Sequence, residues 1–214
     1  MQTAILRQKK IAAPKLQRRY TVDEYLTLER ASAERHWYLD GEIIAMAGES
    51  VSHGRISINA AASLVMQLKG KPCEALTKET KIRSGPIPET GKGRKGLFSY
   101  PDILVVCGEI EHHDAYRDVI LNPKVIVEVL SESTEAFDRG VKFERYQKHN
   151  PSLTDYILIT QDLPQIEHFW RKSADDEEWS YRLHSGLKAK VVIASIRCTL
   201  KMSDVYDRVK FPEE

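Results

Sequence analysis

The sequence predicts an α/β (α+β) fold in which helices flank a central mixed β-sheet and the C-terminal part is rich in strands. Two apolar runs, at 103–106 and 125–129, are continuous enough for central strands that are covered on both faces. A helix-like pattern precedes these runs, and another follows them at 135–149. After Pro151 the chain changes to short alternating segments separated by turns, which is typical of a strand-rich second half.

Length and composition are those of one globular domain. The chain has 214 residues, of which 42% are hydrophobic and 29% charged, so it can bury a full core and is not disordered. The net charge of +1 excludes a strongly basic coat for nucleic acid, although it leaves room for a local basic groove. No apolar run approaches the length of a membrane span, so we expect no membrane partner.

The cysteines indicate a reducing compartment. Cys73, Cys107 and Cys198 are odd in number and far apart in the sequence, and none forms a metal-spaced pair. We therefore expect no disulfide framework, and the cytoplasm is the simplest location. The N-terminus carries charges but no apolar central region, which argues against a secretory signal.

The order of the elements follows from caps, turns and periodicity. Residues 1–19 carry six basic side chains with little periodicity, which predicts a flexible basic arm before a single domain over 20–210. Thr21 and Glu24 match a capping box, which begins a helix that reaches about Arg30. The other predicted helices cover 50–68, where Ser50 or Ser52 is the cap, 135–149 and 203–209. The predicted strands are 36–39, 42–47, 75–83, 101–106, 124–130, 156–160, 165–171, 179–184 and 188–200.

Two acidic residues stand in the predicted core strands. Glu128 interrupts one apolar run and Asp102 begins the other. Burying an unpaired carboxylate costs roughly several kcal/mol, and a divalent metal ion is one way to offset that cost. Each acid could instead lie at a strand end, in water or beside a lysine or arginine. Two such acids, followed by a charged helix, favour a functional site.

The helix after Glu128 adds a cation to this group. Asp138 and Lys142 are four residues apart and share a helix face, which Tyr146 continues. Carboxylates can hold a metal ion, which lowers the pKa of a bound water and neutralises charge on a phosphate. A lysine can orient the attacking water. These acids and this lysine together therefore suit the hydrolysis of a phosphodiester. Oxygen ligands favour Mg²⁺ or Mn²⁺. The alternative for Asp138 and Lys142 is an ordinary surface ion pair.

Other polar residues carry weaker signals. Glu42 begins a strand after the Asp40–Gly41 turn, and His53 lies in the first turn of a predicted helix. Side chains at such positions are commonly solvated or hydrogen-bonded to their neighbours. The glycine-rich basic segment 91–96 lacks the Lys-Ser/Thr ending of a P-loop, but it could border a nucleic-acid groove.

Several of these motifs together match one known family. They are Tyr38-Leu-Asp-Gly-Glu42, His53, Pro101-Asp102, Val127-Glu-Val-Leu-Ser-Glu-Ser-Thr134, and Asp138 with Lys142 and Tyr146. Over about residues 20 to 205 the chain resembles the Uma-two family of bacterial proteins, which belongs to the restriction-endonuclease-like PD-(D/E)xK nuclease superfamily. The segment around Glu128, with its downstream acid and lysine, is the specific part of the match.

The resemblance implies a site as well as a fold. It implies that Asp102, Glu128 and the backbone carbonyl of Val129 are metal ligands, with Mg²⁺ or Mn²⁺ as the ion. The superfamily's lysine normally follows the glutamate by two residues, where this chain has Leu130. In Uma-like members the role moves to the next helix, which corresponds to Lys142. Glu42 matches an additional acidic position, and the accessory candidates are His53, Asp138 and Tyr146.

The leading hypothesis is therefore a metal-dependent hydrolase, an endonuclease that acts on DNA. Cutting both strands of duplex DNA needs two active sites, which makes a homodimer the expected assembly. A second hypothesis is a non-catalytic binding module that keeps the nuclease fold, because Leu130 stands in place of the usual lysine. A third is a glycoside hydrolase that uses the paired acids without a metal.

Overall fold

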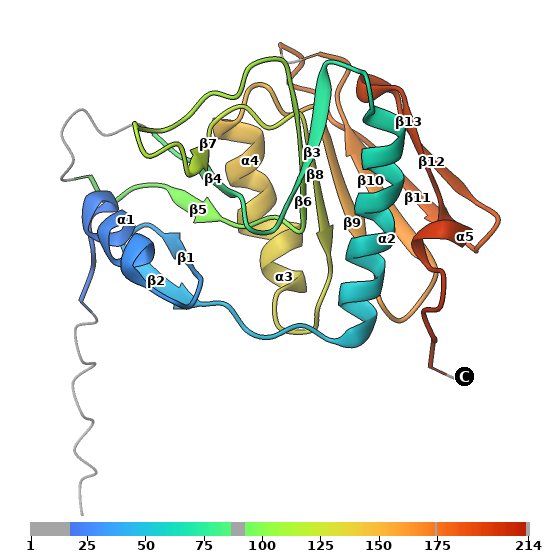
Figure 1. Ribbon diagram of the computed structural model, residues 1–214, viewed down its shortest axis with the longest axis horizontal. Helices are drawn as coiled ribbons and strands as arrows, with labels where there is room; N and C mark the ends of the chain where they lie inside the picture. Colours follow the sequence, from blue (N-terminus) through green and yellow to red (C-terminus); the bar gives the residue numbers. More distant parts are fainter. Residues whose placement is uncertain (1–17, 87–92, 174, 213–214) are drawn as a thin grey trace, which may run out of the picture.

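A six-stranded mixed sheet forms the centre of the computed structural model, which describes residues 18–86, 93–173 and 175–212 (Figure 1). Its strand order is β11-β10-β9-β8-β6-β3. The strands are β3 (Cys73–Thr77), β6 (Ile103–Cys107), β8 (Val125–Val129), β9 (Asp155–Ile159), β10 (Gln165–Trp170) and β11 (Ser180–Ser185). Strands β8 and β9 are parallel and the other neighbours are antiparallel, so the predicted mixed sheet is confirmed.

The apolar runs of β6, β8 and β9 lie at the centre of this sheet because both of its faces are covered. Alternate residues such as Val127 and Ile157 pack towards α2 (Val51–Leu68), and their neighbours Ile126 and Leu158 pack towards the opposite side. Figure 1 shows α2 crossing one face while α3 (Glu135–Phe137) and α4 (Phe143–His149) lie on the other. The central strands therefore tolerate few polar side chains, which makes the acids on β6 and β8 conspicuous.

Local signals placed the first two long helices correctly. Helix α1 (Val22–Ala31) has the predicted capping box, since Thr21 accepts the backbone N–H of Glu24 at 3.2 Å and the Glu24 carboxylate accepts the N–H of Thr21 at 2.8 Å. Helix α2 is capped by Ser50, which accepts the backbone N–H of His53 at 3.0 Å. Among the described helices, none is both long and apolar enough to span a bilayer.

The predicted continuous helix over 135–149 is kinked. A π-helical turn, η1 (Asp138–Lys142), separates α3 from α4. Gly140 has φ −106° and ψ −107°, a non-helical conformation that glycine adopts easily because it has no Cβ atom. The turn matters for the site because Asp138 and Lys142, its first and last residues, are both buried.

A second sheet, ordered β2-β1-β5-β4-β7, lies beside the first. Its strands are β1 (His36–Leu39), β2 (Glu42–Ala45), β4 (Lys81–Ser84), β5 (Leu97–Ser99) and β7 (Val119–Ile120). The single strand predicted over 75–83 is wrong, because the Thr80 N–H closes a turn on the Thr77 carbonyl at 2.9 Å and divides the segment between the two sheets. Strands β5 and β7 were not among the predicted strands, because they are too short to show alternation.

The C-terminal strand predicted over 188–200 is also two strands. Strands β12 (Lys190–Ile193) and β13 (Cys198–Lys201) form a hairpin through the 3₁₀ turn Ala194–Ile196. Arg197 ends that turn in the left-handed region at φ +52°. The hairpin packs Val191, Ile193, Cys198 and Leu200 against the main sheet. The last helix, α5 (Met202–Val205), is shorter than the predicted 203–209.

The expectation that the cysteines stay unpaired is wrong for two of them. Cys73 and Cys107 are direct partners on antiparallel β3 and β6, and they form a disulfide. Their separation of 34 residues hid this contact, because the register that joins them depends on pairing between distant strands. Cys198 is buried and free.

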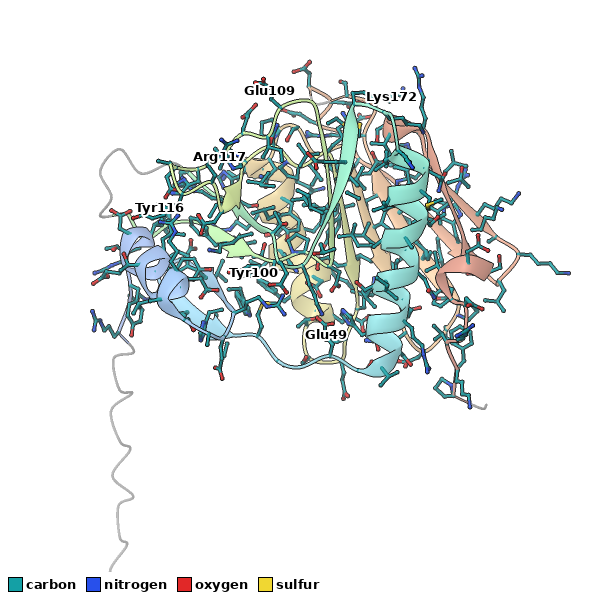
Figure 2. All side chains as sticks on the ribbon, in the orientation of Figure 1. Glu49, Tyr100, Glu109, Tyr116, Arg117 and Lys172 are labelled. Atoms are coloured by element: carbon teal, nitrogen blue, oxygen red, sulfur yellow. A yellow bond between two sulfur atoms is a disulfide. The ribbon has the colours of Figure 1, made fainter. Side chains whose placement is uncertain are left out.

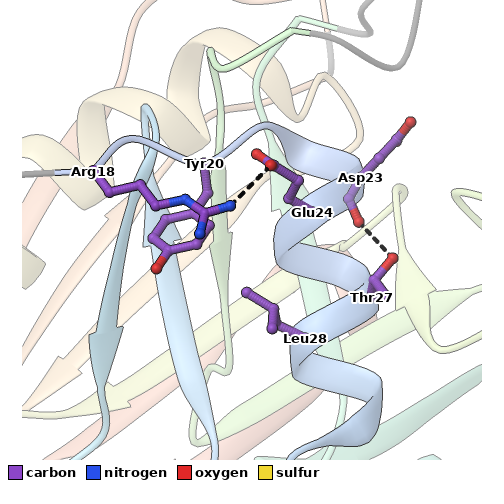
Figure 3. A pocket seen from close by; sticks show the side chains of 6 residues that line it. All are labelled: Arg18, Tyr20, Asp23, Glu24, Thr27 and Leu28. Atoms are coloured by element: carbon purple, nitrogen blue, oxygen red, sulfur yellow. Dashed lines mark hydrogen bonds and ion pairs between the residues drawn. The ribbon is translucent and has the colours of Figure 1, made fainter.

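Most of the predicted basic arm, residues 1–17, lies outside the described residues. Its last two residues hold ion pairs with the domain, Arg18 with Glu24 at 3.3 Å and Arg19 with Glu42 at 3.2 Å. A hollow of about 430 Å³ lies beside this part of the chain and α1 (Figure 3). The Arg18 guanidinium also lies over the Tyr20 ring at 4.8 Å, so its charge already has two neighbouring partners.

Candidate functional site

The pairing of β6 with β8 brings the two core acids together. Ile103 is opposite Val127, so the register places the preceding residue, Asp102, opposite Glu128. Asp102 immediately precedes β6, and its negative charge helps to raise the pKa of Glu128, so the two carboxylates lie near each other. Both acids are buried, with 8% of Asp102 and 4% of Glu128 exposed. The sequence could show each acid on its strand, but only the register makes them neighbours.

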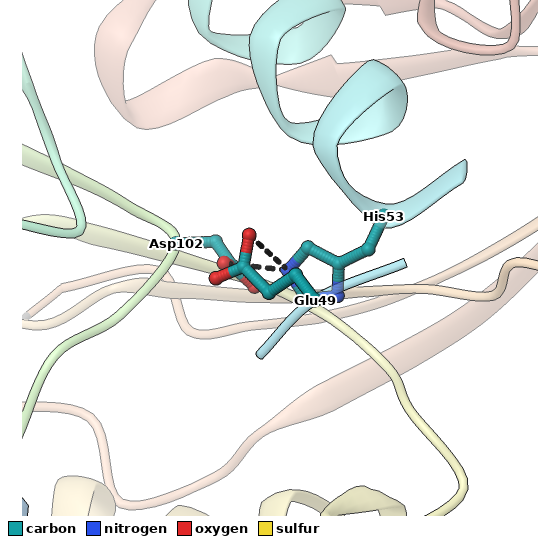
Figure 4. A group of neighbouring side chains, drawn as sticks. All are labelled: Glu49, His53 and Asp102. Carbon is teal, nitrogen blue, oxygen red and sulfur yellow. Dashed lines mark hydrogen bonds and ion pairs between the residues drawn. The ribbon is translucent and has the colours of Figure 1, made fainter. Parts of the chain in front are cut away.

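Asp102 is held by groups from three elements. One carboxylate oxygen lies 2.8 Å from Nε2 of His53, and the other accepts the backbone N–H of Val129 at 2.7 Å. Glu49, just before α2, lies 3.9 Å from the same imidazole nitrogen. Ligand atoms of Glu49, His53 and Asp102 all lie within 4.8 Å of one another, and Figure 4 shows the three side chains converging.

Glu128 faces a different set of partners. The ammonium of Lys142 lies 2.7 Å from one Glu128 oxygen and 2.8 Å from an oxygen of Asp138. The hydroxyl of Tyr146 donates to Glu128 at 3.2 Å and lies 2.9 Å from the hydroxyl of Ser99. The alternative of an ordinary surface ion pair is wrong, since the side chains of Asp138 and Lys142 are buried, at 4% and 9% exposed.

Burial and charge shift the proton affinities of these groups. Burial raises the pKa of Glu128 to about 8, although Lys142 pulls it down; Asp138 and Asp102 raise it further. The loss of hydration on burial explains the upward direction, and one ammonium shared by two carboxylates does not offset it. Burial alone would lower the pKa of Lys142, but Glu128 holds it well above its usual range, so Lys142 stays charged.

The proton affinity of His53 is also displaced. Burial lowers the pKa of His53, but the carboxylate of Asp102 outweighs that effect and the net direction is upward. The contact with Asp102 at 2.8 Å therefore favours a proton on Nε2 when no cation is nearby. A cation at Asp102 would compete with this proton.

Most of the sequence-predicted site residues gather at this end of the sheet. Asp102 contacts His53 and the backbone of Val129, while Glu128 contacts Lys142 and Tyr146, with Asp138 on the far side of the lysine. The structure places Glu42 elsewhere: it begins β2 and pairs with Arg19, and its side chain is 43% exposed.

Sequence reasoning missed Glu49, and it could not decide the role of the lysine. Glu49 precedes His53 by four residues, a spacing that could have pointed to it. Leu130, at the usual lysine position, is 4% exposed and packs in the core. Lys142 reaches Glu128 from η1 instead, which matches the displaced position that the resemblance implied.

The arrangement can bind a divalent cation. Two carboxylates and an imidazole meet at Glu49, His53 and Asp102, and Glu128 is the opposed neighbour of Asp102. Carboxylate and carbonyl oxygens suit Mg²⁺ and Mn²⁺, while an imidazole nitrogen suits first-row transition metals. The donor set therefore fits a divalent metal ion, and the buried lysine beside it suits chemistry on a negatively charged group.

The fold and the site define a mixed-sheet α+β protein with a buried acid and lysine centre. The chain belongs to the Uma2 family, described as "Putative restriction endonuclease", which its residues 22–197 match. This confirms the resemblance found in the sequence.

Relatives and a solved structure agree with this family. Two proteins of Synechocystis sp. (strain ATCC 27184 / PCC 6803 / Kazusa) are similar, "Uncharacterized protein slr1290" and "Uncharacterized protein sll1609". The first is 35% identical, and the match covers 79% of this chain and 84% of the relative. The second is 31% identical, and the match covers 74% of this chain and 84% of the relative. The crystal structure of "a putative nuclease belonging to DUF820" from Anabaena variabilis ATCC 29413 shares the fold, with a TM-score of 0.67, 17% identity, and coverage of 89% of this chain and 99% of that one.

Proposed function

We propose that this chain is a metal-dependent endonuclease that hydrolyses phosphodiester bonds of DNA. The observation that carries the proposal is two buried acids at the same end of the sheet, Asp102 just before β6 and Glu128 on β8, with the charged Lys142 at 2.7 Å from Glu128. The family description and the shared fold of a nuclease support it. A buried centre of this kind is costly to maintain for structure alone, because the free energy lost when charges are removed from water can exceed what their pairing returns.

The proposed metal ligands are Asp102, Glu128 and the backbone carbonyl of Val129. The N–H of Val129 points at Asp102, and in a strand the N–H and C=O of one residue face the same side, which supports a role for its carbonyl. Glu49 and His53 stand beside Asp102 as further donors. Mg²⁺ or Mn²⁺ is the proposed ion.

When bound, a divalent ion would lower the pKa of a water molecule and neutralise charge on the phosphate. The chain's own residues would orient the water and position the acidic ligands. Lys142 holds its ammonium beside Glu128, where it can orient a water and stabilise negative charge that develops on the phosphate. Tyr146 fixes the Glu128 carboxylate by donating a hydrogen bond, and His53 fixes Asp102. We therefore assign Asp138, Tyr146 and His53 as positioning residues.

The substrate is proposed to be duplex DNA, cut by a homodimer that presents one centre to each strand. The proposed domain is a single unit over 20–210. The cytoplasm was expected from unpaired cysteines, and the Cys73–Cys107 disulfide removes that ground, so no compartment is proposed. Glu42 is left out of the centre because its carboxylate pairs with Arg19 at the surface.

Plasmid cleavage tests the proposal. We expect the native chain to nick or linearise supercoiled plasmid in the presence of Mg²⁺ or Mn²⁺. Cleavage should stop when a chelator is added. Glu128→Gln and Asp102→Asn should each lose about 100-fold or more, since each removes a charge that holds the ion. Glu42→Gln is the matched control and should cut like the native chain. Cleavage that persists in chelator, or at native rate in Glu128→Gln, would overturn the assignment.

A non-catalytic binding module is the second candidate, and Leu130 favours it. This residue fills the core at the position of the superfamily's lysine. Calorimetry separates the two candidates, because the module predicts no saturable uptake of Mg²⁺ or Mn²⁺ by the native chain.

A further inference from the structure

A second hollow, of about 470 Å³, lies on the sheet face that α2 and the β12–β13 hairpin cover. It is lined by side chains of β9, β10, β11, β12 and the turn after β12. Lys172, one of its lining residues, and Glu49 of the first site lie at opposite ends of the molecule (Figure 2). The hollow is therefore separate from the proposed nuclease centre. Its size is within the range of small-molecule sites, about 300–1,000 Å³.

The walls of the hollow are rich in positive charge. Lys172, Arg182 and Lys190 line it and are exposed. Within the described residues, no carboxylate lies within ion-pair distance of any of these three side chains. Three cations that share one concave surface without carboxylate partners repel one another, so an anion there would be stabilised.

A fourth cation is built into the wall. The guanidinium of Arg171 is 8% exposed and donates to backbone carbonyls, including those of Leu153 at 2.7 Å and Pro151 at 2.6 Å. Carbonyls fix the orientation of a guanidinium without cancelling its charge. Its positive charge therefore adds to that of the exposed cations.

The carboxylate among the described lining residues, that of Asp155, already has hydrogen-bond partners. Asp155 is 2% exposed, and its oxygens contact Nε2 of His168 at 2.8 Å and accept the hydroxyls of Thr154 and Ser195. Because the Ser195 hydroxyl donates to the carboxylate and not to the imidazole, the three side chains are not a nucleophilic triad. They form a hydrogen-bonded floor, in which a single carboxylate stands against the four lining cations Arg171, Lys172, Arg182 and Lys190.

An aromatic side chain completes the surface. Trp170 lines the hollow, is only partly buried, and shares the sheet face of His168 and Arg182 through the β9–β10–β11 register. A partly exposed indole beside a cationic surface offers a flat face for a nucleobase, while Arg182 and the lysines offer donors for a phosphate.

We propose that this hollow is a phosphate-binding site for a nucleotide unit, with Lys172, Arg182 and Lys190 contacting the phosphate and Trp170 contacting the base. The unit can be a free nucleotide or part of a nucleic-acid strand, since both present the same chemistry. The site acts independently of the centre at Asp102 and Glu128, so it does not rest on nuclease activity.

The test is a binding titration of the full chain in a chelator, so that no metal ion contributes. The probes are inorganic phosphate, thymidine monophosphate and a short oligothymidylate, followed by calorimetry and by tryptophan fluorescence. We expect saturable binding, and the double variant Arg182→Gln with Lys190→Gln should weaken it by about tenfold or more, because charged hydrogen bonds are lost. Lys188→Gln is the matched control; Lys188 is an exposed lysine two residues from Lys190 that does not line the hollow, and its variant should bind like the native chain.

The probes also distinguish the two sources of the phosphate. Tighter binding of the mononucleotide than of phosphate, with quenching that Trp170→Leu removes, supports a free nucleotide. Binding of the oligothymidylate alone, lost in the same double variant, supports a strand. Because Arg182 and Lys190 are exposed, the thermal melting of their double variant should match that of the native chain. The proposal is overturned if none of the three probes binds saturably, or if the folded double variant binds them as the native chain does. Glu128→Gln should leave this binding unchanged, so its outcome is independent of the cleavage assay.

Discussion

Replacing Lys142 with methionine should destabilise the chain strongly and in a pH-dependent way. The substitution keeps the length of the side chain and removes the ammonium that lies 2.7 Å from Glu128 and 2.8 Å from Asp138. Both carboxylates are buried and would be left without their shared cation. Removing one partner of a buried ion pair costs about 3–5 kcal/mol. For a chain of this size each kcal/mol lowers the melting temperature by roughly 2–4 °C, so we expect a fall of about 6–20 °C.

The pH dependence follows from Glu128. Its pKa is raised from 4.5 to about 8, so the folded state holds a proton that the unfolded state has lost. The stability contributed by this proton is complete below pH 4.5 and is lost as the pH rises through about 8. Without Lys142 the pKa rises further, and the gap in stability between variant and native chain should widen from pH 6 to pH 9.

Thermal melting at pH 6, 7.5 and 9 measures this effect. Arg139→Met is the matched control, because Arg139 lies on the same π-helical turn and also contacts two carboxylates, those of Glu135 and Glu167, but its side chain is 34% exposed. We expect a smaller loss, of about 1 kcal/mol. Adding Glu128→Gln to Lys142→Met should restore part of the stability. The buried ion pair is refuted if the Lys142→Met chain has the native melting temperature at all three pH values. It is also refuted if Lys142→Met and Arg139→Met lower the melting temperature equally.

Two further predictions concern stability. Reducing the Cys73–Cys107 disulfide, or replacing both cysteines with serine, should lower the free energy of unfolding by about 4 kcal/mol, because the unfolded chain regains the entropy of an open loop of 34 residues. Thiol titration of the unfolded, non-reduced chain should detect only Cys198. Three free thiols would contradict the disulfide. Burial raises the pKa of Asp118, but Arg30 and Lys81 outweigh it and lower the pKa from 3.8 to about 2. The stability that Asp118 contributes is present above pH 3.8 and is lost as the pH falls through 2. The free energy of unfolding of Asp118→Asn should therefore fall less between pH 4 and pH 2 than that of the native chain. An unchanged fall would contradict the ion pairs of Asp118 with Arg30 and Lys81.

The elements that the sequence predicted well depend on neighbours in the chain. The capping box joins Thr21 to Glu24 within one turn, and the hairpin between β1 and β2 turns at Asp40 and Gly41, whose φ values are +47° and +102°. The composition of the apolar runs was also sufficient to identify β6 and β8 as core strands, because burial on both faces requires continuous apolar residues.

The features that escaped prediction depend on contacts between distant segments. The disulfide needs the β3–β6 register, and the position of Glu49 beside Asp102 needs α2 to pack across the sheet. The π-helical turn shows no periodicity signal of its own, yet it carries Lys142 to Glu128. Asp102, Glu128 and Lys142 were found as candidates because charge in an apolar context is visible in sequence, but their mutual contacts were not.

A crystal soaked with Mn²⁺ tests the central claim most directly, because the anomalous scattering of manganese locates the ion without any assumption about activity. The account predicts one strong peak bonded to carboxylate oxygens of Asp102 and Glu128, at about 2.0–2.6 Å. It also predicts that the peak disappears in Asp102→Asn. A peak elsewhere in the molecule, or none at saturating Mn²⁺, would contradict it.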